Sequence, residues 1–202
     1  MMVIGITGGT GCGKTTLLEA IKAQGGLVLD CDAIYHGLLQ TDKEMLAAIE
    51  DRFPGTVENG ALQRKKLGAI VFADEQALLD LNRITHASVN REVLRRLETA
   101  PALAAIDAIG LFEGGLAELC DVTVAVTAPE EARVKRLMAR DQISEDYARS
   151  RIRAQHSEDW FRERCDYILS NDGGLDAFAT NCLAFLRHLS IMKEKCKKEH
   201  EL

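Results

Sequence analysis

The stretch GITGGTGCGKTT, residues 5–16, decides the fold of this chain. It places four glycines and a lysine within seven residues, directly after the apolar run 2–7. Glycine lets the backbone adopt a positive φ and approach another molecule closely, and Gly8-x-x-x-x-Gly13-Lys14-Thr15 matches the phosphate-binding P-loop pattern. An ordinary glycine-rich turn would not need the Lys-Thr pair. The stretch therefore predicts a nucleoside triphosphate site.

A helical pattern over residues 14–24 follows this loop, so the positive end of a helix would point at the phosphates. Backbone N–H groups of the loop would surround the phosphate oxygens, and Lys14 would bring a full charge near the β- and γ-phosphates. The hydroxyl of Thr15 would be offered to Mg²⁺. We expect ATP to be bound by six consecutive residues, namely Gly11, Cys12, Gly13, Lys14, Thr15 and Thr16.

Length and composition predict one domain over residues 1–202, because 47% of the residues are apolar and the chain is long enough for a sizeable core. The formal net charge of −6 argues against nucleic acid or an anionic membrane as a partner. No apolar run approaches the roughly 20 residues that span a bilayer, and no basic segment precedes a long apolar one, so we expect a cytoplasmic protein. The six cysteines form no metal-binding or disulfide pattern and are expected to be reduced thiols.

Five short apolar segments alternate with helical patterns, at residues 2–7, 26–30, 103–109, 122–127 and 167–170. This alternation predicts an α/β fold in three layers, with a five-stranded parallel sheet covered by helices on both faces. Ligands of such sheets bind at the carboxyl ends of the strands. Asp30, Asp32 and Asp107 should therefore lie near the P-loop.

Two further segments are predicted to be helical. Residues 33–100 are helical except at FPGTVENGAL, residues 53–62, and this stretch is too long for a simple crossover. We interpret it as a helical insertion that covers the acceptor. Residues 130–160 are helical and rich in arginine, and we interpret them as a lid that closes over ATP.

The P-loop leaves the reaction open, and the rest of the chain favours phosphoryl transfer. A GTPase would need an Asn-Lys-x-Asp motif for guanine, but no Asn-Lys pair occurs, although DAIG at 107–110 matches an Asp-x-x-Gly pattern. Small-molecule kinases have about this size, helical flaps over the acceptor and an arginine-bearing lid. Two alternatives stay open: a kinase for another small metabolite or nucleoside, and a P-loop protein that binds nucleotide without turnover.

An ordered set of stretches resembles the dephospho-CoA kinase family over residues 3 to about 175. These stretches are LDCDAIYH (29–36), NGALQRKKLGAIVF (59–72), LNRITH (81–86), DAIGLFEGGL (107–116), CDVTVAV (120–126), KRLMARD (135–141), AQ (154–155) and DYILSND (166–172). The chain departs from the family pattern at Ala87 and at residues 109–111, which bears on the shape of the acceptor pocket. The resemblance implies ATP-dependent phosphorylation of the 3′-hydroxyl of dephospho-coenzyme A, with Mg²⁺, and leaves the oligomeric state open.

On the acceptor side the resemblance implies four residues. Asp32 matches the family's proposed base, while Asp30 is the better helix cap. Arg64 and His86 would bind phosphate or ribose of the acceptor, and Glu113 would orient the ribose or a metal-bound water. Each has a structural alternative: Asp32 as a helix cap, His86 as a core histidine and Glu113 as a turn residue.

On the donor side the resemblance implies Arg136, Arg140 and Asn171. Arg136 and Arg140 are four residues apart, so they share a helix face from which they could neutralise ATP phosphates or stack on adenine. We expect Arg140 to be catalytic together with Lys14 and Asp32. Asn171 would contact the edge of adenine, and its alternative is a turn residue in SNDGG.

Overall fold

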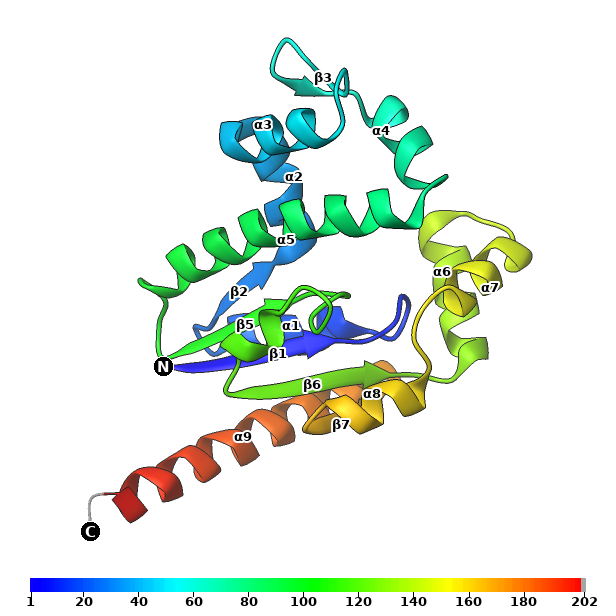
Figure 1. Ribbon diagram of the computed structural model, residues 1–202. Coiled ribbons are helices and arrows are strands. Elements are labelled where there is room, and N and C mark those ends of the chain that lie inside the picture. Colours follow the sequence, from blue (N-terminus) through cyan, green and yellow to red (C-terminus); the bar gives the residue numbers. More distant parts are fainter. Residues whose placement is uncertain (201–202) are drawn as a thin grey trace.

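The computed structural model describes residues 1–200, and its centre is a five-stranded sheet (Figure 1). The strands are β1 (Met2–Thr7), β2 (Leu27–Asp30), β5 (Leu103–Asp107), β6 (Val122–Thr127) and β7 (Tyr167–Ser170). They lie in the order β2-β5-β1-β6-β7, and all neighbouring pairs are parallel. The predicted parallel α/β fold is confirmed. The third strand ends at Asp107, two residues before the predicted end.

Helices cover both faces of this sheet because its strands are apolar on both sides. On one face, Ile4 and Val124 pack with α1 (Lys14–Ala23) and α9 (Leu175–His200). On the other, Val3 and Ile106 pack with the carboxyl-terminal half of α5 (Glu75–Leu97) and with the short helix η1 (Leu116–Leu119). The side chains of adjacent residues such as Val3 and Ile4 thus pack against helices on opposite faces of the sheet, as the two-residue period of a strand requires.

The predicted insertion is built from α2 (Cys31–Thr41), α3 (Lys43–Arg52), α4 (Arg64–Val71) and a two-stranded hairpin, β3 (Val57–Glu58) with β4 (Ala61–Leu62). Figure 1 shows these elements stacked above α5, away from the sheet. They have an apolar core of their own around Ile49, Phe53 and Leu67, which the amino-terminal half of α5 completes with Ala77. The predicted interruption at FPGTVENGAL is this hairpin, and Asn59 and Gly60 turn it with positive φ angles.

The arginine-rich segment forms α6 (Glu130–Asp141), α7 (Glu145–Arg153) and α8 (Glu158–Arg164). The first two form a helical pair at the right of Figure 1, with a small apolar core of Val134, Leu137, Ala148 and Ile152. Gln142, in the left-handed conformation, ends α6, and the Ser144 hydroxyl caps α7. α8 then returns to the sheet, where Trp160 contacts the Phe112 ring.

Two further properties of the described chain concern membrane-spanning helices and cysteines. No helix within residues 1–200 combines the length and the apolar character that crossing a bilayer requires. Cys12, Cys31, Cys120, Cys165 and Cys182 are free thiols, and Cys196 lies outside the side chains that the structure describes.

Candidate active site

The P-loop leads from the end of β1 to the start of α1 through tightly fitted glycines. Gly8 has φ +129°, and a Cβ there would lie 2.2 Å from the Val126 carbonyl oxygen, so the loop passes directly over β6. Gly13 has φ +98° and precedes α1 without a side-chain cap. No side-chain cap occupies the start of α1, as in helix amino termini that bind phosphate.

A cavity of about 410 Å³ opens above this loop. Its floor consists of loop residues that include Gly11, Gly13, Lys14 and Thr15, and its walls carry Asp32, Asp107, Arg136, Arg140 and Arg151. The ammonium of Lys14 donates to the Gly8 carbonyl oxygen at 3.0 Å and has two further N–H donors. We call this the donor cavity. It collects the basic side chains expected around phosphates.

Two expected ATP-binding residues of the loop do not line the donor cavity with their side chains. The Cys12 thiol is 2% exposed in the core beneath the loop, and burial raises its pKa, with Arg133 and Lys14 opposing that effect. Thr16 lies in the first turn of α1, where its N–H donates to the Gly13 carbonyl oxygen at 3.1 Å.

The side-chain amide of Asn171 is hydrogen-bonded within the protein at both ends. Its side chain is 4% exposed, Nδ2 donates to the Cys12 carbonyl oxygen at 2.8 Å, and Oδ1 accepts from Arg136 Nη2 at 3.2 Å. Its own N–H donates to the Thr127 carbonyl oxygen, which joins β7 to β6. Both ends of the amide are thus engaged beneath the P-loop in this structure, and the expected contact with adenine stays a prediction.

Arg136 lines the donor cavity and also fastens the loop, because Nη1 donates to the carbonyl oxygens of Gly11 (3.1 Å) and Cys12 (3.3 Å). Arg133, one helical turn earlier, donates from Nε to the Thr10 carbonyl oxygen at 2.9 Å. The role of Arg133 could not be predicted from the sequence, because only the fold shows which arginines of this segment face the loop.

Arg140 is 60% exposed at the rim of the donor cavity and pairs with Asp141 through two bonds of 2.7 and 3.0 Å. Arg151, from α7, donates to the same carboxylate at 2.6 Å and lines the same cavity. The two guanidinium groups lower the pKa of Asp141 to about 2. Two cationic side chains are thus held over the loop by one carboxylate, and Arg151 joins the arginines singled out from the sequence.

Asp107 ends β5 at the back of the donor cavity. Burial raises the pKa of its carboxyl to about 6, Asp30 and Asp32 add to this effect, and Lys14 opposes it. Its Oδ1 is buried without a hydrogen-bond partner. Asp107 and Thr15 both line the donor cavity, and a carboxylate with a hydroxyl fits Mg²⁺, which takes one or two protein ligands and completes its shell with phosphates and water. Within the described residues no cluster of three or more His, Cys, Asp or Glu forms a metal site alone.

The two aspartates after β2 have different roles. Asp30 is the N-cap of α2, where its carboxylate accepts from the Ala33 N–H at 2.9 Å. Asp32 lies in the first turn of α2 and is exposed. The capping alternative thus belongs to Asp30, and Asp32 lines both the donor cavity and a second cavity.

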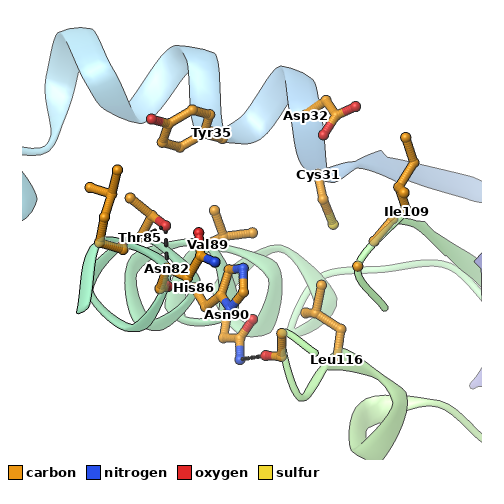
Figure 2. Close-up of a pocket in the computed structure, with 14 residues that line it drawn as sticks. Cys31, Asp32, Tyr35, Asn82, Thr85, His86, Val89, Asn90, Ile109 and Leu116 are labelled. Atoms are coloured by element: carbon orange, nitrogen blue, oxygen red, sulfur yellow. Dashed lines mark hydrogen bonds between the residues drawn. The ribbon is translucent and has the colours of Figure 1, made fainter. Parts of the chain in front are cut away.

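This second cavity, of about 260 Å³, lies between α2, α5 and the loop after β5, and we call it the acceptor cavity. Figure 2 shows Asp32 and Tyr35 on α2 at one side of it and His86 on α5 at the other, while Asn90 of α5 points to the loop after β5. The half-buried His86 ring has a pKa lowered by burial, while Glu113 acts in the opposite sense. Asn90 donates to the Gly114 carbonyl oxygen at 2.7 Å and so holds the loop after β5 against α5.

Arg64 and Glu113 line neither of these two cavities. Arg64, exposed at the start of α4, lies 3.5 Å from His36 Nδ1, and its charge lowers the pKa of Tyr35, which burial raises more strongly. It therefore lies near Tyr35, which lines the acceptor cavity. Glu113 lies in the loop after β5, six residues beyond the end of the strand, and its carboxylate bonds the ring of His156.

Comparisons with known proteins agree with this arrangement. Residues 2–177 match the family model described as dephospho-CoA kinase. The chain is 36% identical to a dephospho-CoA kinase of Syntrophotalea carbinolica, over 94% of this chain and 92% of the relative, and 38% identical to one of Anaeromyxobacter dehalogenans, over 89% and 88%.

Solved structures show the same fold. A protein from Thermus thermophilus superposes with a TM-score of 0.77 at 34% identity, over 93% of this chain and 97% of that one. A dephospho-CoA kinase of Campylobacter jejuni (TM-score 0.66, 24% identity, 95% and 98% covered) and a shikimate kinase of Acinetobacter baumannii (0.52, 17%, 96% and 95%) share the fold. Since the family model spans most of the residues that build both cavities, the chain belongs to the dephospho-CoA kinase family.

Proposed function

We propose that this kinase transfers the γ-phosphoryl group of ATP to the 3′-hydroxyl of dephospho-coenzyme A, giving coenzyme A and ADP. Family membership supports the reaction, and one observation supports its site. The donor and acceptor cavities adjoin, and among the side chains that the structure describes Asp32 is the one ionisable group that lines both. A hydroxyl placed beside Asp32 faces the P-loop, which is where phosphoryl transfer requires it.

On the donor side, Gly11, Gly13 and the first turn of α1 would bind the phosphates through backbone N–H groups. Lys14 would exchange the Gly8 carbonyl for a phosphate oxygen. Arg140 and Arg151 would turn from Asp141 towards the negative charge that develops on the transferred group. Arg136 and Asn171 would keep the loop in place, because their bonds to loop carbonyls do not need the ligand.

Mg²⁺ would be held by the Thr15 hydroxyl and the unpartnered Asp107 Oδ1, together with phosphate oxygens. When bound, it neutralises phosphate charge. Lys14 and the arginines do the same from the protein side.

On the acceptor side, Asp32 would accept the proton of the attacking 3′-hydroxyl and hold that oxygen towards the γ-phosphorus. The acceptor cavity is smaller than the roughly 300–1,000 Å³ of sites that enclose a drug-sized ligand. Only the nucleoside end of dephospho-coenzyme A would enter, between Tyr35 and His86. Its pyrophosphate would then lie near Arg64.

The experiment that tests this proposal compares Asp32→Asn with Asp30→Asn. Asp32→Asn should reduce transfer by ~10²–10⁴-fold, as expected for loss of a general base, and leave ATP binding unchanged. Asp30→Asn should keep both, because Asn caps a helix as well as Asp does. Coenzyme A formation would be measured directly and ATP affinity by calorimetry.

Several outcomes would contradict the proposal. Wild-type protein that forms ADP with shikimate or a nucleoside, and not with dephospho-coenzyme A, would assign the same donor site to a different acceptor. Full transfer by Asp32→Asn would remove Asp32 from the chemistry. Dependence on Mg²⁺ and a cytoplasmic location stay predictions.

A further inference from the structure

Two adjacent side chains in the turn between α7 and α8 reach opposite sides of the site. Gln155 Oε1 accepts from the Thr10 N–H at 2.8 Å and from Arg133 Nη2 at 2.9 Å, which ties the turn to the P-loop. The fit is tight, since a Cβ on Gly9 would lie 3.0 Å from the same oxygen. The turn and the P-loop are therefore held together through Gln155.

His156, the next residue, points to the acceptor side. Its Nε2 bonds the carboxylate of Glu113, and its ring stacks on Trp160 with centroids 3.8 Å apart and planes at 4°. Trp160 in turn contacts the Phe112 ring edge-on at 5.5 Å. Glu113 and Phe112 belong to the loop of residues 108–115, so this loop is tied to the turn by a polar contact and an aromatic one.

The loop of residues 108–115 forms one wall of the acceptor cavity, to which it contributes Ala108, Ile109, Gly110 and Gly114. A small cavity of about 150 Å³ separates this wall from the turn, with Gly9 of the P-loop and Gly110 among its lining residues. The P-loop and the acceptor wall thus meet across this gap, and Gln155 and His156 join them.

We propose that His156 is a positioning residue that couples the acceptor wall to the P-loop through Glu113. This inference rests on the proposed function for its effect on turnover. The side chains of the pair are 45% and 42% exposed, so their bond adds little to stability. Its effect is on geometry, because a hydroxyl displaced from the line of attack reacts far more slowly.

The test uses His156→Phe, which keeps a flat ring on Trp160 and loses the bond to Glu113. His156→Gln restores an N–H donor, and His188→Phe makes the same change on the exposed surface of α9, beside Tyr167. His156→Phe should lower kcat by roughly tenfold with KM for ATP unchanged, within the range seen for residues that link two coupled sites. His156→Gln should recover most of this loss, and His188→Phe should behave as wild type.

A second measurement needs neither turnover nor dephospho-coenzyme A. A non-hydrolysable ATP analogue alone should slow hydrogen exchange over residues 108–115 in wild type, in His156→Gln and in His188→Phe, but not in His156→Phe. The inference is overturned if the analogue protects residues 108–115 in His156→Phe as much as in wild type. It is also overturned if the analogue does not protect them in wild type, whatever the activity. Absence of coenzyme A formation in wild type would instead overturn the proposed function, and the exchange comparison would still decide the role of His156.

Discussion

At the scale of single residues, burial and the charge of Lys14 have opposite effects on the pKa of Asp107 in the donor cavity. Asp107 is held in a largely buried position that raises its pKa from 3.8 to about 6, although Lys14 lies close enough to lower it. Ionisation of this carboxyl therefore lowers the free energy of unfolding. Such a cost is typical of a group kept for its chemistry, because stability alone would favour a neutral side chain.

The pH dependence of stability tests this cost. Between pH 4 and 6 the folded protein keeps a proton on Asp107 that the unfolded chain has released, so the contribution of this group to stability falls as the pH rises. A pKa raised from 3.8 to about 6 corresponds to at most about 3 kcal/mol. Asp107→Asn should be more stable than wild type by up to that amount at pH 8, and its advantage should vanish below pH 4. Urea unfolding at both pH values measures it.

The exposed Asp51→Asn on α3 is the matched control and should show no such difference. Equal stability of wild type and Asp107→Asn at pH 8 would mean that Asp107 is better solvated than its burial indicates.

Lys14 gives the second prediction at this scale. Lys14→Ala should reduce turnover by at least ~100-fold, because it removes a preorganised charge that stabilises the transferring phosphoryl group. Lys22→Ala, at the end of the same helix, removes only an exposed pair with Glu19 and should leave turnover unchanged. Near-normal turnover of a folded Lys14→Ala protein would contradict the role given to the P-loop lysine.

At the scale of elements, the predicted lid divides into an anchored and a free part. The first turns of α6 are fixed to the P-loop by Arg133 and Arg136. α7 is joined to α6 by their small apolar core and by Arg149, which pairs with Glu130 and Glu131. Arg140 and Arg151 bond Asp141 rather than the P-loop. Closure should therefore occur in the outer part, where Arg140 and Arg151 lie.

Hydrogen exchange can separate these two parts. ATP together with dephospho-coenzyme A should slow exchange over residues 138–153, because a lid closes to exclude water from the reacting phosphate. Residues 130–137 should change less, since they are already anchored. Uniform protection over 130–160 would indicate that the whole lid moves, and unchanged exchange throughout would rule out closure.

The elements also show how far a sequence can be interpreted. The five strands were predictable because a parallel strand buried on both faces is a continuous apolar run, as in residues 122–127. Asp30 could be recognised as a cap from its place before α2. The hydrogen bond of Asn171 to the P-loop could not be predicted, because its partner Cys12 is 159 residues away in the chain. The pairing of Glu113 with His156 depends in the same way on two loops that only the fold brings together.

At the scale of the whole molecule, the insertion and the sheet have separate cores that meet along α2 and α5. Ile49 and Phe53 pack in the insertion, whereas Val89 and Val93 of α5 pack on the sheet. The prediction of one domain over residues 1–202 therefore depends on cooperativity, that is, on whether the insertion unfolds alone or only together with the sheet.

Ile49→Ala tests this, because Ile49 is fully buried in the insertion. The substitution should cost about 2–5 kcal/mol. If the insertion opens as a separate unit, as its separate core leads us to expect, hydrogen exchange should accelerate over residues 39–71 and stay slow in β1 and β6. Ile70→Ala, on the exposed side of α4, is the control. Equal acceleration in the sheet would show that both cores unfold together.

Trp160 has a further consequence for experiments on this protein. It is the chain's single tryptophan, and its indole lies between the His156 ring and the Arg164 guanidinium, whose carbon is 4.4 Å from the ring centroid. The fluorescence of an indole depends on the groups that touch its faces. Here one of those groups, His156, belongs to the turn that joins the two halves of the site, and the other, Arg164, ends α8. The protein thus contains its own optical probe, and rapid-mixing fluorescence can time the arrival of each substrate without a foreign dye.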